Sequence, residues 1–498
     1  MTFGEVVYLT LPEIIIFCFA ILAFGFDLAA TRLRRNAYGV LIARPQRVSW
    51  LPYFALAGLT LALLATALLP GANQVLFSGM FAVDPFAVFF KVVAYLAVGL
   101  VVLFSVDYMA SRPFSGEFYG LLLLSALSIT LVAASTNLIM IFLSLEFLSI
   151  SSYILVGYLR EDARSSEAAL KYFLFGAMAS AAMLYGMSLI YGLTGSLGLA
   201  EIARFFTSEE SPGYQIVIYP AAVLVLAGLG FKIAAVPFHQ WAPDTYEGAP
   251  TPVTAFLSVA PKAAGFAALL RFFITALPHV TVDWALLIAV VSVATMTVGN
   301  LIAIAQANVK RMLAYSSIAQ AGYVLIGLAA VGSLTSNEFG TPAVLIYLLG
   351  YLFTNLGAFI VVIVFERATG SNQIADYAGL MRRAPFLAVS LVVFFLSLTG
   401  FPSTAGFIGK LFVFASAIQG QLVWLAILGV VNSVISVYYY FNVVRQMFFL
   451  PARDTSPIAE TVPLRWALLI ALAMTFVIGL YPQPFVELVR YSAQFVQF

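Results

Sequence analysis

The sequence is poor in charged residues and in side chains that bind metals. Asp, Glu, Lys and Arg make up 9% of its 498 residues, whereas an average soluble domain has about 25%. It contains one cysteine, Cys18, and two histidines, His239 and His279. Haem, iron–sulfur and zinc sites need more thiolate or imidazole ligands than these. The composition therefore excludes a soluble globular domain and predicts that the chain carries no cofactor or metal. The net charge of +2 gives no indication of a nucleic-acid partner.

Hydrophobic residues instead make up 62% of the sequence. They form continuous runs of about 20 residues, each long enough to cross a bilayer as a helix, and they do not alternate as the strands of a β-barrel do. The first run starts without a preceding basic segment, so we interpret it as a retained span and not as a signal peptide. The pattern predicts an all-α polytopic membrane protein with about 14 transmembrane helices. They begin near Leu11, Leu51, Pro85, Phe118, Leu138, Ala168, Gln215, Pro252, Trp284, Met312, Pro342, Pro385, Leu422 and Leu464.

The distribution of basic residues predicts the topology. An even number of spans places both termini on one side of the membrane. Loops after odd-numbered spans hold sixteen Lys and Arg residues, whereas loops after even-numbered spans, the tail included, hold only Arg204 and Arg490. Because basic loops stay in the cytoplasm, we expect both termini on the outer side.

Six basic residues lie within spans, and five of them are lysines although arginine is the commoner basic residue in this chain. An ionisable side chain near the bilayer centre costs about 3 kcal/mol, so several of them are unlikely to be accidental. Lysine, unlike arginine, releases its proton when it is desolvated. We therefore predict proton-carrying roles for the four lysines that lie best within the spans. They are Lys171, Lys232, Lys262 and Lys410.

Three basic residues near span ends have a structural interpretation. Lys91 lies six residues into the third span, where its side chain can snorkel to the interface. Snorkelling is also the alternative for Lys171, which lies near the start of the sixth span. Arg271, near the end of the eighth span, is expected to anchor the helix at the interface.

Glu146 is the one carboxylate that the sequence places deep within a span, in SLEFLSISSYILVGY. Desolvation raises the pKa of a carboxyl group and lowers the pKa of an amine, which brings both toward neutral pH. A buried glutamate together with buried lysines is therefore typical of a proton relay. His239 is a candidate relay as well, with a polar helix cap as the alternative.

Two spans contain helix breakers beside a lysine. Pro237 follows Lys232 in GFKIAAVPFHQW, and Pro402 precedes Lys410 in SLTGFPSTAGFIGK. A broken helix at membrane depth is tolerated where it is buried in protein or lines a polar cavity. Each break falls in the fourth span of a five-span unit, and an odd-numbered unit that repeats directly reappears upside down. We predict two inverted five-helix repeats with broken helices 7 and 12.

The domain organisation follows from this repeat. We expect a single membrane domain, because no long linker or low-complexity segment interrupts the chain. Its parts are helices 1–3 in residues 1–116, the first repeat in 117–280, the second repeat in 281–450, and helix 14 with the tail in 451–498.

Several long motifs resemble the antiporter-like membrane subunits of proton-pumping NADH:quinone oxidoreductase, respiratory complex I, with subunit N as the nearest type. They include SLEFLSISSYILVGY, EAALKYFLFGAMASA, QANVKRMLAYSSIAQAGY, NQIADYAGL and GFPSTAGFIGK. The resemblance covers nearly the whole chain. It implies fourteen helices, two inverted repeats, and functional roles for Glu146 and the four lysines. The arginine-rich loop at 31–49 is longer than the family pattern.

The resemblance also implies partners and a location. Flavin, iron–sulfur clusters and quinone are expected on partner subunits, and this chain is expected to contact other membrane subunits, lipid and protons. A bacterial cytoplasmic (inner) membrane is the expected location, with a thylakoid-type membrane as the alternative. A subunit of a cation/proton antiporter or of a membrane-bound hydrogenase is the second interpretation. A scaffold subunit, whose buried charges only hold helices together, is the third.

Overall fold

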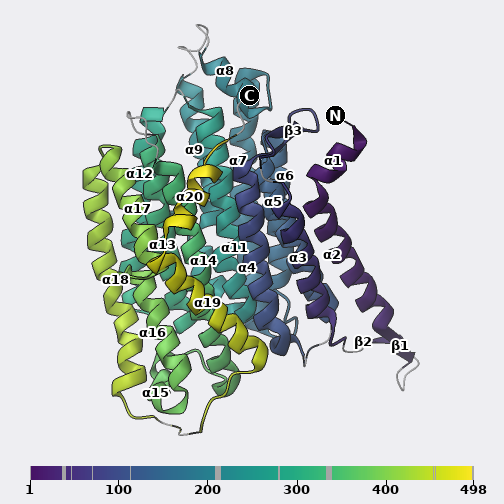
Figure 1. Ribbon diagram of the computed structural model, residues 1–498, viewed down its shortest axis with the longest axis vertical. Helices are drawn as coiled ribbons and strands as arrows, with labels where there is room; N and C mark the ends of the chain where they lie inside the picture. The colour runs from purple at the N-terminus through teal and green to yellow at the C-terminus, as the bar shows by residue number, and fades with distance from the viewer. Residues whose placement is uncertain are drawn as a thin grey trace.

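A computed structural model describes residues 2–35, 41–45, 48–69, 71–110, 112, 114–207, 215–278, 281–332, 339–452, 454 and 456–495. These residues form a bundle of long helices that run roughly side by side (Figure 1). Within the described ranges, 12 helices are long and apolar enough to cross a bilayer. The remaining predicted spans coincide with α3 and with the pair α16 and α17, which are shorter. The all-α membrane fold is confirmed, and the exact number of crossings stays a prediction.

The N-terminal part contains four helices and two small hairpins. The N-cap of α4 illustrates how the sequence starts a helix, since the Asp84 side chain accepts a hydrogen bond from the Ala87 amide at 2.8 Å. The elements are α1 (Phe3–Leu9), α2 (Leu11–Ala30), β1 (Thr31–Arg35), β2 (Leu41–Pro45), α3 (Leu51–Ala67), β3 (Gln74–Leu76), β4 (Phe81–Val83) and α4 (Pro85–Met109).

The next elements fall in the predicted first repeat. Asn137 and Asp162 cap α6 and α7, which places polar N-caps just before long apolar runs. The elements are α5 (Ser115–Ala134), α6 (Leu138–Val156), α7 (Ala163–Thr194), α8 (Leu199–Thr207), α9 (Gln215–Ile233), α10 (Trp241–Gly248), α11 (Thr251–Leu270) and the π-helical η1 (Arg271–Ala276).

The same order of long and interrupted helices then recurs. In both units three long helices precede an interrupted one, and a fifth helix follows it. The elements are α12 (Thr281–Ile304), α13 (Val309–Val331), α14 (Gly340–Thr369), η2 (Ile374–Tyr377), α15 (Leu380–Arg383), α16 (Pro385–Thr399), α17 (Ala405–Gln419) and α18 (Val423–Phe449). The chain ends with α19 (Val462–Leu480) and α20 (Gln483–Ser492).

The core lies where the two units meet. The membrane segments of α11 and α14 are wholly buried, and these helices pack on each other. In Figure 1, α19 runs obliquely across one face of the bundle, where it packs on α14, α17 and α4. A polar residue on α11 is therefore shielded from lipid by protein on every side.

The two termini lie at the same end of the bundle, and the β1–β2 hairpin lies at the opposite end (Figure 1). The hairpin is antiparallel, with Thr31 opposite Pro45 and Arg35 opposite Leu41. It occupies part of the arginine-rich loop, of which residues 36–40 and Arg47 lie outside the described residues. At the end that holds the termini, β3 pairs with β4.

Candidate functional site

The first interruption separates α9 from α10. The helix ends at Ile233, four residues before Pro237, where Ala234 takes a left-handed conformation with a φ of 59°. The Phe231 carbonyl accepts from the Trp241 indole and from the Ala234 amide, each at 3.0 Å, and the Gly230 carbonyl accepts from the Ala235 amide at 2.8 Å. The protein itself thus supplies partners for these two carbonyls at the first break.

Lys232 occupies the last turn of α9 and is 3% exposed. Its ammonium donates to the Ser149 hydroxyl of α6 at 2.9 Å. Glu146 lies one turn away on α6, is half-buried, and accepts a hydrogen bond from the Ser180 hydroxyl of α7. The structure thus brings Lys232 close to Glu146, because the ammonium is bound by Ser149, which lies one turn from Glu146 on α6. The ion pairs of the described residues do not include this pair.

Lys262 lies on α11 at the centre of the bundle and is 2% exposed. Its ammonium donates to the Ser317 carbonyl of α13 at 2.6 Å. The Ser317 hydroxyl in turn accepts from the Tyr351 hydroxyl at 2.9 Å. The amine is therefore held by neutral groups of the second unit.

The buried face of α13 continues this polar region toward the second break. The Gln320 amide donates to the Leu398 carbonyl of α16 at 3.0 Å and its oxygen accepts from the Tyr347 hydroxyl. Asn300 donates to the Tyr323 hydroxyl at 3.0 Å. Polar side chains thus follow α13 from Lys262 toward the lysine of α17.

The second interruption separates α16, which ends at Thr399, from α17, which begins at Ala405. Lys410 is 4% exposed and donates to the Thr399 carbonyl and to the Ser433 hydroxyl, each at 2.9 Å. Its ammonium also lies 4.4 Å from the centre of the Tyr323 ring. The C-terminal end of a helix is the negative end of its dipole, so it stabilises this cation. Pro402 lies in the exposed turn between the two half-helices.

Lys171 has different surroundings from the other three lysines. Its amine pairs with Glu167 at 2.8 Å and with Asp244 of α10 at 2.9 Å, and its side chain is 40% exposed. Arg311 at the start of α13 pairs with the same Asp244 at 2.5 Å. Burial raises the pKa of the Asp244 carboxyl, but its hydrogen bonds to Lys171 and Arg311 outweigh this and hold the pKa below its usual value. Lys171 therefore belongs to a charged cluster that links the two units at one end of the bundle.

His239 lies between the half-helices and is half-buried. Its Nδ1 is buried and has no hydrogen-bond partner among the described residues. The choice between a proton relay and a polar helix cap stays a prediction for His239.

The interface interpretations of Lys91 and Arg271 are wrong. The Lys91 amine is fully buried and pairs with Glu13 at 2.8 Å, so it does not snorkel. Arg271 is fully buried and makes two hydrogen bonds to Asp84, at 2.6 and 2.7 Å. Opposite charges on helices distant in sequence draw both side chains inward. Lys310, which we assigned to a loop, is buried in the first turn of α13 and donates to the Ala249 carbonyl at 2.8 Å.

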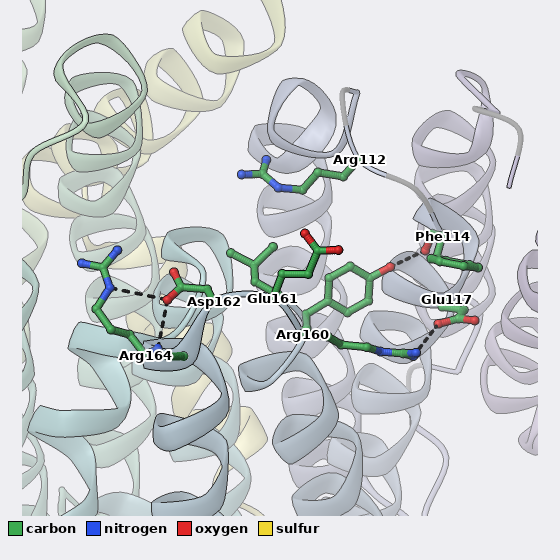
Figure 2. Close-up of a pocket in the computed structure, with 10 residues that line it drawn as sticks. Arg112, Phe114, Glu117, Arg160, Glu161, Asp162 and Arg164 are labelled. Carbon is green, nitrogen blue, oxygen red and sulfur yellow. Dashed lines mark hydrogen bonds and ion pairs between the residues drawn. The ribbon is translucent and has the colours of Figure 1, made fainter. Parts of the chain in front are cut away.

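A pocket of about 680 Å³ lies beside the charged cluster that contains Lys171, at the loops that precede α5 and α7. Figure 2 shows Arg160 directed at Glu117 and Arg164 directed at Asp162 among the residues that line it. Arg164 also lines the smaller cavity that contains Lys171. Both acidic and basic groups line the larger pocket, and none of the predicted site residues is among them.

Sequence reasoning missed the groups that hold the amines. Ser149, Ser317 and Ser433 are ordinary span residues in the sequence, and carbonyl acceptors such as Thr399 carry no residue signal. Asp244 could have been considered, because it is an acidic residue at a span end. The sequence does not show which cation pairs with it.

These features define a class, a polytopic membrane protein with two interrupted helices and buried lysines. The family described as NADH:quinone oxidoreductase/Mrp antiporter, transmembrane, matches residues 135–436, and the chain belongs to this family.

Within the family, the chain is similar to the quinone oxidoreductase subunits. It is 41% identical over 497 residues to NADH-quinone oxidoreductase subunit N of Dehalococcoides mccartyi, which covers 98% of this chain and 99% of the relative. It is 44% identical to NAD(P)H-quinone oxidoreductase subunit 2 of Gloeothece citriformis, over 86% of this chain and 83% of that one. A chain of respiratory complex I from Thermus thermophilus with bound aureothin has a TM-score of 0.77 and 34% identity, with 96% of this chain and 98% of that chain covered.

Proposed function

We propose that this chain is the proton-translocating subunit N of an NADH:quinone oxidoreductase. Electron transfer takes place on partner subunits that carry flavin, iron–sulfur clusters and quinone, and this chain contributes no redox centre. The observation that carries the proposal is the set of three buried amines held by neutral oxygen atoms at or between two helix interruptions. An amine without a contacting carboxylate changes its proton affinity strongly when a charge nearby changes.

In the first unit, Glu146 controls Lys232. The carboxylate lies one turn from Ser149, the residue that holds the ammonium, so it stabilises the charged lysine without contacting it. When Glu146 is neutralised or its side chain turns away, the ammonium loses this attraction and releases its proton. Both groups lie in half-buried or buried positions, where the Coulomb interaction is stronger than in water.

Lys262 and Lys410 carry the proton onward. Lys262 accepts it at the junction of the two units, and the polar face of α13 leads to Lys410. Lys410 releases it to the opposite side of the membrane. Tyr246, Thr245 and Asn355 each contain a buried polar atom without a hydrogen-bond partner in the described part of the chain, which favours ordered water near this path.

Lys171 and His239 act on the uptake side of the path. The cluster of Lys171, Asp244 and Arg311 is partly exposed, and its shared carboxylate, Asp244, lies on α10, directly after the first break. We assign this end to the cytoplasm and the end that holds the termini to the outer side of a bacterial cytoplasmic membrane, from the distribution of basic residues. A carboxylate shared by two cations exchanges its partners readily when one of them changes its charge.

A cation/proton antiporter subunit is the second candidate, because the family that matches this chain also includes Mrp antiporter subunits. Sodium-dependent proton transport in vesicles without any quinone reaction would favour it over the first.

The test is proton translocation per electron in an assembled complex that carries Glu146→Gln or Lys232→Met. We expect quinone reduction to continue with fewer protons moved per electron. Full translocation in both variants would show that the two residues have no such role. Full translocation by an isosteric neutral pair would favour the scaffold interpretation.

A further inference from the structure

A second buried pair of titratable groups lies outside the path described above. Glu13, in the first turn of α2, and Lys91 on α4 approach to 2.8 Å, with side-chain exposures of 8% and 0%. Lys91 lies about 9 Å along the helix axis from Pro85 at the rise of an α-helix. Its end of α4 is the end of the bundle that holds both termini, so the pair lies near the outer surface in the topology proposed above.

Polar atoms gather around this pair without enough partners. Apart from the contact between Lys91 and Glu13, neither carboxylate oxygen and no N–H of the amine has a hydrogen-bond partner among the described residues. The Tyr95 hydroxyl, one turn from Lys91 on the same face of α4, is buried and is also without one. Buried polar atoms are nearly always hydrogen-bonded, and a group of them without protein partners indicates ordered water.

The same helix carries a pair of the opposite kind. Asp84, the N-cap of α4, accepts two hydrogen bonds from Arg271, and the Arg271 Nε donates to the Ala133 carbonyl at 2.9 Å. The rings of Phe86 and Phe495 lie 4.7 and 5.3 Å from the guanidinium. All three guanidinium nitrogens and both carboxylate oxygens of this pair are hydrogen-bonded, and its cation keeps its proton. The pair of Asp84 and Arg271 is therefore suited to a purely structural role. The pair of Glu13 and Lys91 differs from it in two ways, because it lacks further hydrogen bonds and its cation can release a proton.

We propose that Glu13, Lys91 and Tyr95 form a hydrated proton-exchange site that faces the outer side of the membrane. This inference rests on the proposed function and adds a site to it. In the exchange, an N–H bond of the Lys91 ammonium breaks as an O–H bond forms on the Glu13 carboxylate, which leaves a neutral amine and a neutral acid. The acid then gives its proton to water at the outer surface. The amine recovers a proton from a hydronium ion that arrives from the inner part of the protein.

An apolar cover separates the pair from the outer surface. The ring of Phe81 on β4 lies 5.7 Å from the Lys91 amine and belongs to a small cluster of apolar residues. The cluster consists of Leu9, Leu69, Leu76, Phe81, Val83, Ala87 and Ala134. Glu13 has the more exposed side chain of the pair, at 8% against 0%, but both of its carboxylate oxygens are buried, so water reaches the carboxyl group only when this cover opens.

The experiment compares variants of the assembled complex by two measurements, protons moved per electron and the infrared carbonyl stretch of a protonated carboxyl group during turnover. Lys91→Arg keeps the charge but does not release a proton. We expect it to lower the proton-to-electron ratio with quinone reduction retained. We expect the carbonyl band to be lost in both Lys91→Arg and Glu13→Gln. Arg271→Lys is the matched control, because Arg271 of η1 pairs with Asp84 at the N-cap of α4, and it is expected to keep the wild-type ratio and band.

Arginine is larger than lysine, so Lys91→Arg could act by disturbing the packing. The neutral double variant Glu13→Gln/Lys91→Met controls for this steric effect. It removes both charges together and so leaves neither of them unpaired in this buried position, and it should show the lowered ratio. A wild-type ratio in this double variant would overturn the proposal, as would an equal fall in Arg271→Lys. The proposed function is tested separately, by the variants Glu146→Gln and Lys232→Met.

Discussion

The two helix interruptions hold their lysines by different means. At the first, Trp241 satisfies a carbonyl at the end of α9, and Lys232 turns to the Ser149 hydroxyl of a neighbouring helix. At the second, Lys410 itself satisfies the Thr399 carbonyl at the end of α16. A carboxylate lies one turn from the partner of Lys232, whereas Lys410 is held by a carbonyl, a hydroxyl and an aromatic ring.

This difference indicates two roles. A charge that lies near an acid is adjusted through the acid, so Lys232 is suited to receive a signal from Glu146. A charge that is stabilised by helix dipoles and neutral groups depends on the geometry of the break itself. Lys410 is therefore suited to respond when the two half-helices move relative to each other.

The largest expected effect is loss of translocation in Lys410→Met. Among the described residues no carboxylate pairs with Lys410, whose contacts are the Thr399 carbonyl, the Ser433 hydroxyl and the Tyr323 ring, so no carboxylate replaces the missing proton carrier. Removal of an acid–base group lowers a proton-transfer rate by about 100-fold or more. Lys232→Met should have a smaller effect, because Glu146 remains. Proton uptake by vesicles that contain each assembled variant measures the difference, and equal losses would contradict the comparison.

Gln320→Leu should destabilise the second break. It leaves the buried Leu398 carbonyl without a donor and the Tyr347 hydroxyl without its acceptor. Each unsatisfied buried group costs about 1–3 kcal/mol. Thermal unfolding of the purified complex in detergent should show a lower midpoint for this subunit. An unchanged midpoint would mean that water replaces both partners.

Trp241→Phe is the matching change at the first break and should have a smaller effect. It removes one of two donors to the Phe231 carbonyl, which keeps its hydrogen bond from the Ala234 amide at 3.0 Å, so the cost is at most about 1.5 kcal/mol, and the aromatic packing on Tyr172 is kept. The same unfolding measurement applies. A larger decrease in the unfolding midpoint than in Gln320→Leu would contradict the order that the hydrogen bonds predict.

The smallest expected effect is that of Thr295→Val, which removes the hydroxyl that accepts from the Val236 amide at 3.0 Å. This bond ties the first break to α12 of the second unit. Because Val236 is only half-buried, water can reach its amide, and the loss should be about 1 kcal/mol. Translocation should be retained, and its loss would show that the tie between units is part of the transport mechanism.

Much of the architecture follows from the sequence alone. Continuous apolar runs located the long helices, and proline and glycine beside Lys232 and Lys410 located the interruptions, because both signals are local. The partners of the buried charges depend on how helices distant in sequence pack. Nothing near Lys91 indicates Glu13, and nothing near Arg271 indicates Asp84, so both were assigned to the interface. Lys171 appears equivalent to the other lysines in the sequence, but Asp244 draws it into the exposed cluster.

The account depends most on buried amines that gain and lose protons during turnover. Lys410→Arg tests this directly, because arginine keeps a positive charge and donors for the Thr399 carbonyl but does not release its proton. The measurement is the number of protons translocated per electron by the assembled complex. We predict that quinone reduction continues while this ratio falls, and a wild-type ratio in Lys410→Arg would contradict the account.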